Sequence, residues 1–404
     1  MEVRINADNA PVNLFAPESR RRLFLKPGKE RVVANRHPWI FAGAIAKESG
    51  NADAAVADLV DNDGKVIASG FYSQHSQIRL RALTFGEEAL TEEVFRARID
   101  AACARRTFEH SNAARLVNSE GDDLSGLVID LYDDVAVIEI ANRGLELVRE
   151  IVVDALRERG VRLIYFKNEL PARKLEQLPT TDETRGDGAA TATLVENGLR
   201  FLVEPASGQK TGFFLDQREN RQLTRGLARG KRVLNLFSYT GAFGVYAAVG
   251  GAAHVDNVDV SAGAIEMAKQ NYALNGSEAA FTVADAFSFL RHTYHQGTDR
   301  WDLIVCDPPA FAKSHNDVNR AARGYKDINL YALRLLNPGG MLMTFSCSGH
   351  LSSDLFQKIV FSAALDSGRR ASFIRRLTAG PDHPVSLFAP EGEYLKGFLL
   401  QTLS

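Results

Sequence analysis

The stretch RVLNLFSYTGAFG, residues 232–244, decides how the C-terminal half of the chain folds. It reads as a buried strand that runs into a glycine turn and then into a helix. Six more apolar strands are expected to follow it, at HVDNVDV (254–260), AFTVAD (280–285), DLIVCD (302–307), MLMTFSC (341–347), ASFIRRL (371–377) and YLKGFLLQTL (394–403). Because strands and helices alternate, the pattern predicts an α/β domain with a seven-stranded, mostly parallel sheet of the Rossmann type.

Upstream of this domain the sequence divides into three further sections. Residues 1–22 read as a tail. Residues 23–88 show short apolar runs broken by turn signals, including Asn62-Asp63-Gly64, and predict a small β-barrel. Residues 89–204 mix helices and hairpins, which indicates a small central α+β domain. The α/β domain is therefore expected at residues 205–404.

Composition limits the classes of protein that remain. The 404 residues are 45% hydrophobic and 24% charged, as in soluble globular proteins. No apolar run reaches the roughly 18 residues of a membrane span, and the first residues lack a signal-peptide pattern, so we expect a cytoplasmic protein. The three cysteines, Cys103, Cys306 and Cys347, are too widely spaced for a disulfide framework or a zinc site, and no metal is expected.

Positive charge is concentrated near the N-terminus, although the net charge of −2 argues against nonspecific binding of nucleic acid. The cationic residues of this segment are Arg20, Arg21, Arg22, Lys26, Lys29, Arg31 and Arg36. Such an excess is suited to RNA phosphates, and a solvated basic surface is the alternative.

A cofactor site is expected where the strands of the α/β domain end, because ligands bind beyond the carboxyl ends of such sheets. Phe237 ends the first strand, and Tyr239 and Gly241 lie in the loop after it, which is no G-x-G-x-x-G dinucleotide motif. Gly241 would let the backbone come close to a ligand, and a purely structural glycine is the alternative. S-adenosylmethionine (SAM) has no pyrophosphate and needs no such motif. Asp259, after the second strand, could accept hydrogen bonds from ribose hydroxyls, and Asp285, after the third, from an adenine amino group. Helix capping is the alternative for both aspartates.

The fourth and fifth strands end in residues suited to catalysis. Asp307 opens the sequence Asp-Pro-Pro-Ala-Phe, a pattern typical of methyltransferases that act on planar nitrogen edges, and a plain turn is the alternative. Cys347 ends the fifth strand, which should neighbour the fourth. A thiolate there could add to C6 of a pyrimidine and make C5 nucleophilic. Cys306 is predicted to be a core residue, with a nucleophile on the fourth strand as the alternative.

Together these segments resemble those of bacterial large-subunit rRNA cytosine-C5 methyltransferases that carry an N-terminal PUA domain. The similar segments are LKPGKERVVANRHPWIFAGAI (25–45), GFYSQHSQI (70–78), EPASGQKTGFFLDQRENR (204–221), LFSYTGAFGVYAA (236–248), DVSAGAI (259–265), CDPPAFAKS (306–314) and FSCSGH (345–350). The resemblance covers nearly the whole chain after residue 22 and identifies residues 23–88 as the PUA-like domain.

The resemblance implies a function and several site residues. It implies that Asp216, Gln217 and Arg218 line the cofactor side of the fold and that Cys347 is the nucleophile. We therefore expect SAM-dependent methylation of a cytosine C5 in large-subunit rRNA, with Asp307 on the N3/N4 edge of the base. The general base is not identified, and Glu393 is a weak candidate. Uracil-C5 or guanine-nitrogen methylation, or a non-catalytic RNA-binding assembly factor, remain alternatives, and a homodimer is left open.

Overall fold

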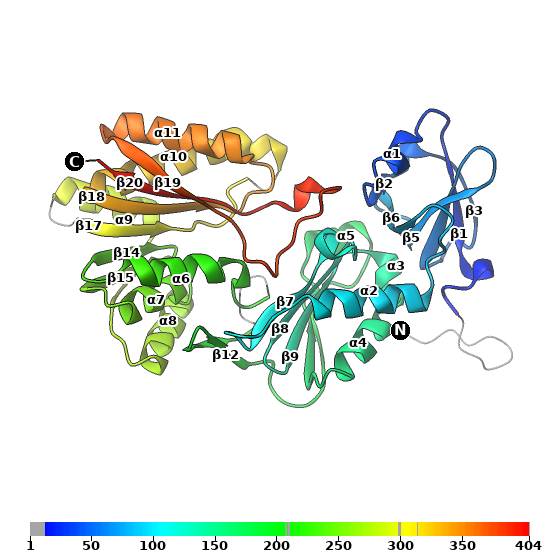
Figure 1. The fold of residues 1–404 in the computed structure, drawn as a ribbon, viewed down its shortest axis with the longest axis horizontal. Helices are drawn as coiled ribbons and strands as arrows, with labels where there is room; N and C mark the ends of the chain where they lie inside the picture. The colour runs from blue at the N-terminus through cyan, green and yellow to red at the C-terminus, as the bar shows by residue number, and fades with distance from the viewer. Residues whose placement is uncertain (1–12, 207, 209–210, 298–299, 313, 404) are drawn as a thin grey trace. The chain divides into compact units, whose positions relative to one another are not determined.

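The computed structural model describes residues 13–403 except 207, 209–210, 298–299 and 313, and the chain forms two compact units (Figure 1). The first unit consists of Met1–Ala192, Val203–Phe213 and Asp382–Gly392. The second unit consists of Thr193–Leu202, Phe214–Pro381 and Glu393–Ser404. Part of the predicted tail, residues 1–12, lies outside the described residues, and the first strand begins at Arg21.

The N-terminal part of the first unit is a six-stranded mixed sheet. In spatial order its strands are β2 (Trp39–Phe41), β6 (Ile78–Phe85), β5 (Val66–Tyr72), β4 (Val56–Val60), β1 (Arg21–Leu25) and β3 (Ile45–Gly50). Short helices accompany them: η1 (Pro17–Ser19), α1 (Arg31–Ala34) and η2 (Ala42–Ala44). The strands alternate or run apolar because one face packs on a core that includes Leu23, Leu59 and Leu80.

A five-stranded sheet forms the rest of the first unit. Its order is β11 (Glu183–Arg185), β10 (Leu163–Phe166), β9 (Val135–Ile140), β8 (Leu127–Tyr132) and β7 (Ala113–Asn118). Its helices are α2 (Glu92–Ala104), η3 (Ser119–Asp122), α3 (Arg143–Leu147), α4 (Arg149–Arg157) and α5 (Pro171–Leu175). Phe71 and Leu83 of the N-terminal sheet join the same hydrophobic cluster as Phe95 and Ile129 of this part. The two parts of the first unit therefore share one hydrophobic cluster, and the N-terminal sheet has a separate core of its own.

The second unit is built on a seven-stranded sheet. Its order is β16 (Ala280–Val283), β15 (His254–Asp259), β14 (Arg232–Leu236), β17 (Trp301–Cys306), β18 (Leu336–Ser346), β20 (Lys396–Thr402) and β19 (Ala371–Leu377). The first five are parallel neighbours, and β20 pairs antiparallel with both β18 and β19. The predicted α/β fold and all seven strand positions are confirmed, as is the adjacency of the strands that end at Asp307 and Cys347.

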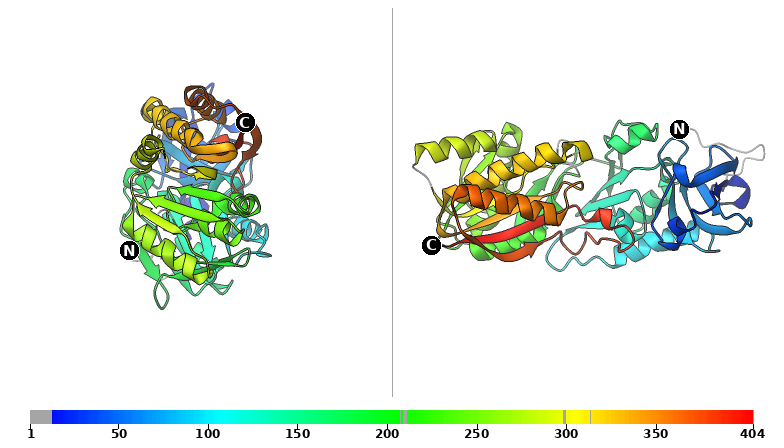
Figure 2. Two further views of the ribbon diagram at one scale, coloured as in Figure 1. Left: turned by 90° about the vertical axis from the view of Figure 1, so that its left-hand side faces the viewer. Right: turned by 90° about the horizontal axis from the view of Figure 1, so that it is seen from above.

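Helices cover both faces of this sheet, as a doubly wound fold requires. The helices of one face are α6 (Arg218–Leu227), α7 (Ala242–Val249) and α8 (Ala262–Leu274), and those of the other are α9 (Ala286–Gln296), α10 (Val318–Leu335) and α11 (Ser353–Ser367). The end-on view in Figure 2 shows the green and the yellow-to-orange helices on opposite sides of the strands. Short helices η4 (Leu215–Gln217), η5 (His315–Asp317) and η6 (Pro390–Gly392) lie in the connections.

Two segments group with a different part of the chain than their sequence position suggests. The hairpin β12 (Ala192–Glu196) and β13 (Leu199–Val203) lies largely in the second unit, where buried Glu196 forms a bidentate ion pair with buried Arg221 of α6. Residues 382–392, between β19 and β20, belong to the first unit. The predicted boundaries at residues 88 and 204 remain predictions.

Candidate active site

The predicted site residues of the second unit lie at or after the carboxyl ends of β14, β15, β16, β17 and β18, together with the segment that opens α6. The carboxyl ends of parallel neighbouring strands meet at one edge of the sheet, about 4.8 Å apart from strand to strand. That edge is where ligands of open α/β sheets bind. The structure therefore gathers residues from six separate stretches of sequence at one edge.

Asp307 is held in place by the segment that precedes α6. The Gln217 side-chain nitrogen Nε2 donates to Asp307 Oδ2 at 3.0 Å. Asn220 Nδ2 in turn donates to Gln217 Oε1 at 2.6 Å and to the Thr378 carbonyl at 3.1 Å, which fixes the orientation of the Gln217 amide. Gln217 and Asn220 are buried, whereas Asp307 is partly exposed. A carboxylate is thus presented at the rim of β17, where Gln217 holds its Oδ2.

Cys347 follows the last residue of β18 and is half-buried. Its Sγ lies 3.7 Å from the Pro308 carbonyl oxygen, so the thiol sits against the loop that begins with Asp307. The next residue, Ser348, ties these elements together: its Oγ accepts from the Ala312 amide at 3.2 Å and lies 3.0 Å from the Tyr325 hydroxyl. The backbone around Cys347 is therefore anchored to both the β17 loop and α10.

Lys396 is a polar residue of this region that the sequence reading missed. It opens β20, is 5% exposed, and its Nζ donates to the Ser348 carbonyl at 2.7 Å. Burial lowers the pKa of Lys396, while the charges of Cys347 and Glu393 act in the opposite direction. In the sequence, Lys396 stands directly before the apolar run GFLL (397–400). A lysine in that position is ordinary at the start of a strand and does not by itself indicate a functional site. The pairing of β20 with β18 is what places Lys396 beside the end of β18.

Cys306 is packed in the core. It is fully buried among the apolar side chains between β17 and α10, and burial raises the pKa of its thiol well above the usual range. Its predicted place in the core is confirmed. A thiol that is both inaccessible and hard to ionise is a poor nucleophile, so the alternative at the fourth strand is disfavoured.

The loop after β14 adopts an unusual backbone conformation. Phe237, Tyr239 and Gly241 all have positive φ, at 54°, 47° and 80°. At Gly241 a Cβ would also lie 2.9 Å from the Ala268 Cβ of α8, so close helix packing requires glycine there. The sequence left open whether this glycine serves ligand approach or packing, and the contact that the structure provides is with a helix.

The two predicted cofactor aspartates are held differently. Asp259 accepts from the Tyr239 amide at 2.8 Å through Oδ2 and from the Ser261 amide at 2.9 Å through Oδ1, and Ser261 rather than Asp259 caps α8. Asp285 is exposed and caps α9, accepting from the Ser288 amide at 2.9 Å. Capping, the alternative reading, therefore applies to Asp285. Each carboxylate oxygen can accept more than one hydrogen bond, so neither arrangement prevents ligand binding.

Asp216 and Arg218 flank Gln217 on η4 and α6, and all three are buried. Asp216 Oδ2 accepts from the Tyr394 hydroxyl at 2.6 Å, and its carbonyl accepts from the Gly380 amide. Glu393, the weak candidate for a general base, is exposed. Among the described side chains, no group of three or more His, Cys, Asp or Glu is arranged to hold a metal ion.

The donor and acceptor set at this edge suits SAM. The carboxylates of Asp259, Asp285 and Asp307 can accept from hydroxyl and amino groups and favour a cationic ligand over a phosphate. In the part of the chain that the structure describes, the buried hydroxyls of Ser238 and Thr240, in the loop after β14, have no hydrogen-bond partner. Buried polar groups are normally paired, so both hydroxyls are available to hydrogen-bond a bound group.

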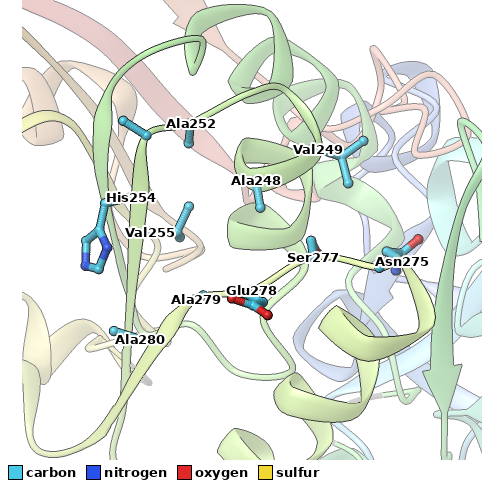
Figure 3. Close-up of a pocket in the computed structure, with 12 residues that line it drawn as sticks. Ala248, Val249, Ala252, His254, Val255, Asn275, Ser277, Glu278, Ala279 and Ala280 are labelled. Atoms are coloured by element: carbon cyan, nitrogen blue, oxygen red, sulfur yellow. The ribbon is translucent and has the colours of Figure 1, made fainter.

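A surface pocket of about 710 Å³ lies elsewhere on the second unit (Figure 3). Its lining includes His254 and Val255 at the start of β15 and Asn275 and Glu278 after α8. These residues lie at the amino end of β15, opposite the edge that carries Asp307 and Cys347. The pocket is therefore separate from the candidate active site.

The basic segment of the first unit is partly used for structure. Arg20 is buried, pairs with Asp58 at 2.9 Å and donates to the Leu90 carbonyl, and Arg21 pairs with Glu48. Five of the seven cationic residues remain exposed, namely Arg22, Lys26, Lys29, Arg31 and Arg36. No helix that the structure describes is long and apolar enough to cross a membrane.

Two family models match separate segments of the chain. A sequence model described as S-adenosylmethionine-dependent methyltransferase matches residues 174–393, and a PUA-like domain model matches residues 23–85. The chain is 44% identical over 392 residues to the ribosomal RNA large subunit methyltransferase I of Shewanella denitrificans, covering 94% of this chain and 98% of the relative. It is 43% identical over 394 residues to the protein of the same name from Tolumonas auensis, covering 94% and 99%.

Solved structures show the same fold. A methyltransferase structure in complex with SAH superposes with a TM-score of 0.80 at 22% identity, over 94% of this chain and 99% of that chain. A SAM-dependent methyltransferase from Streptococcus mutans superposes with a TM-score of 0.79 over the same shares. At 22% sequence identity, this similarity establishes the fold alone.

Proposed function

We propose that this chain, which belongs to the ribosomal RNA large subunit methyltransferase I family of SAM-dependent methyltransferases, methylates C5 of a cytosine in large-subunit rRNA. The observation that carries the proposal is the half-buried Cys347 at the rim of β18, against the loop that begins with Asp307 on the neighbouring strand. C5 of cytosine is a poor nucleophile by itself. Methylation there needs a group that adds to the ring, whereas methylation of a ring nitrogen does not.

In the proposed reaction the Cys347 thiolate gives its electron pair to C6 of the base and forms an S–C6 bond. The electrons of the C5–C6 double bond move into the ring, and C5 becomes nucleophilic. C5 would take the methyl group that SAM supplies: the C5–CH3 bond forms as the sulfonium S–CH3 bond breaks, and S-adenosylhomocysteine leaves. A base then removes the C5 proton, and the electrons of that C–H bond restore the double bond and release the cysteine.

The other site residues have supporting roles in this proposal. Asp307, oriented by Gln217, would hold the N3/N4 edge of the cytosine as charge enters the ring. Asp259 and Asp285 would bind the ribose and the adenine of SAM, with the loop from Phe237 to Gly241 and the segment from Asp216 to Arg218 completing the site. The exposed cations of the first unit would bind RNA phosphates.

Nucleoside analysis tests this proposal. The purified chain is incubated with SAM carrying a labelled methyl group and with large-subunit rRNA, and the RNA is digested to nucleosides. Label in 5-methylcytidine is expected. Label in 5-methyluridine or in a methylguanosine would favour the other enzyme classes, and tight SAM binding without methyl transfer to any RNA would favour a non-catalytic assembly factor. Bisulfite sequencing of rRNA from a deletion strain then locates the nucleotide.

A further inference from the structure

Lys396 is the buried cation next to Cys347 and has no role in the reaction described so far. It lies directly opposite Ser346 in the β18–β20 register, one residue before Cys347. Its Nζ donates to the carbonyl of Ser348, one residue after Cys347. Lys396 therefore lies on the neighbouring strand, opposite the residue before Cys347, and contacts the backbone of the residue after it.

The position of this lysine is fixed by the packing of β20. At Gly397 a Cβ would lie 2.4 Å from Phe345 Cδ1 and 2.9 Å from the Leu377 Cβ. Glycine thus lets the start of β20 lie tightly between β18 and β19. With the backbone held this closely, the Lys396 side chain is constrained to the end of β18.

Burying an ammonium group is costly unless another charge or a set of hydrogen bonds offsets the cost. Lys396 has one carbonyl partner at 2.7 Å, and the charges close enough to favour its ammonium form are those of Cys347 and Glu393. Glu393 is exposed, so water weakens its effect. The electrostatic influence is mutual: a thiolate that favours the ammonium is itself favoured by it.

We propose that Lys396 is a positioning residue that holds Cys347 as a thiolate: its buried ammonium offsets the charge on the sulfur, and its hydrogen bond to the Ser348 carbonyl fixes the turn that presents the sulfur. The thiol proton passes to solvent, and Lys396 keeps its own. The proposal rests on the proposed function, because it concerns the activation of the proposed nucleophile.

Three titratable groups near this pair come from other parts of the fold. Tyr325 on α10 is near Cys347 and has a pKa raised by burial, so it stays neutral at ordinary pH. Glu393 precedes β20, and Asp307 follows the neighbouring strand β17. Negative charge on either carboxylate would disfavour a thiolate, and the ammonium group of Lys396 would act against it.

Alkylation of Cys347 by iodoacetamide tests the proposal without RNA or SAM. The rate is followed by mass spectrometry of the peptide that contains Cys347, from about pH 5 to about pH 10, a span that covers ordinary thiol pKa values. The variants are Lys396→Met, which removes the charge and the donor, and Lys396→Gln, which removes the charge but keeps a donor. Lys167→Met is the matched control, because Lys167 is also buried and donates to carbonyls, those of Pro205 and Gly208, in the first unit.

In both Lys396 variants we expect the midpoint of the alkylation profile to move to higher pH by about one unit or more, which is about tenfold slower alkylation below the midpoint. Lys167→Met should leave the profile unchanged. Coincident profiles for wild type and Lys396→Gln would overturn the proposal. Should the variants not fold, the wild-type profile decides: a Cys347 midpoint at or above the ordinary thiol value of about 8.5 also overturns it.

This test separates the inference from the proposed function. If Cys347→Ala retains methyl transfer, the C5 chemistry fails, while the alkylation profile still reports whether Lys396 favours the thiolate. If Cys347→Ala is inactive but the profile ignores Lys396, the proposed function stands and the inference fails.

Discussion

The Gln217 side-chain amide donates a 3.0 Å hydrogen bond to Asp307 Oδ2, which joins the segment before α6 to the rim of β17. Ninety positions of sequence separate the two residues. The amide cannot turn over freely, because Asn220 donates to its oxygen. Gln217 is therefore the residue that sets the orientation of the Asp307 carboxylate.

Gln217→Glu should lower methyl transfer strongly. The new carboxylate cannot donate to Asp307 and repels it, and hydrogen bonds to charged groups contribute about 1.5–3 kcal/mol, or roughly 10- to 150-fold in rate. Steady-state kinetics of methyl transfer measure the effect. Gln401→Glu is the control, since Gln401 donates to the Gly339 carbonyl at the other end of the sheet. Equal rates for Gln217→Glu and wild type would remove Gln217 from the site.

Asp259→Ala should weaken SAM binding by about 1.5–3 kcal/mol, the scale of hydrogen bonds to a charged group. The substitution removes the acceptor for the proposed ribose contact and also frees the Tyr239 and Ser261 amides. Asp259→Asn keeps an acceptor oxygen and should lose less. Isothermal titration calorimetry with SAM measures both. Unchanged affinity in Asp259→Ala would show that this carboxylate only fixes the loop.

Reversing charge on the exposed part of the basic segment should weaken RNA binding. Replacing Lys29, Arg31 and Arg36 with glutamate removes three exposed cations, so the dependence of log K on log salt should become shallower by about 2–3. SAM affinity should not change. Binding titrations at several salt concentrations measure the slope, and Lys358→Glu on α11 is the exposed control. An unchanged slope in the triple variant would give the segment another role.

The packing of the first unit favours surface substitutions over a deletion of its N-terminal part. Removing residues 1–85 altogether would expose the core that Phe71 and Leu83 share with Phe95. Arg20 is also unsuitable, because it is buried against Asp58. Surface substitutions leave the core intact and usually change stability by less than about 0.5 kcal/mol.

The buried pair Arg221–Glu196 should dominate the stability of the hairpin that precedes α6. Its two side-chain hydrogen bonds measure 2.8 and 2.7 Å, and both residues are almost fully buried. Arg221→Met leaves an unpaired buried carboxylate, which costs about 3–5 kcal/mol. Urea denaturation measures the loss. Lys358→Met, at an exposed pair with Asp354, should cost little, and similar losses in both variants would contradict this account.

The sheet of the second unit could be predicted from the sequence because its strands are buried on both faces and are therefore continuously apolar. The same apolar pattern also predicted that Asp307 and Cys347 lie at one edge of the sheet, where their two strands end. The roles of Lys396 and Asn220 could not be predicted in this way. A lysine before a strand and an asparagine in a helix are ordinary in sequence, and they gain meaning only through the β18–β20 register and the contact with Gln217.

Two sequence interpretations depended on contacts between distant elements. For Gly241 the sequence left open whether the glycine serves ligand approach or packing, and the structure shows that α8 packs against it. The basic segment read as one surface, whereas Arg20 and Arg21 are paired with Asp58 and Glu48 from strands further along the chain. In both cases the residue type was evident from the sequence, but its contacts depend on elements that are distant in the chain.

Trapping with 5-fluorocytosine in RNA tests the central claim most directly. The C5 fluorine cannot leave as a proton, so a covalent adduct through Cys347 should not resolve after methyl transfer. Wild-type chain, SAM and the substituted RNA should give a complex that survives denaturing electrophoresis. Cys347→Ala should give no complex and no product but should still bind SAM, and Cys306→Ala should retain trapping apart from a packing loss of about 1 kcal/mol. Trapping that requires Cys306 and not Cys347, or methylation without any cysteine adduct, would contradict the account.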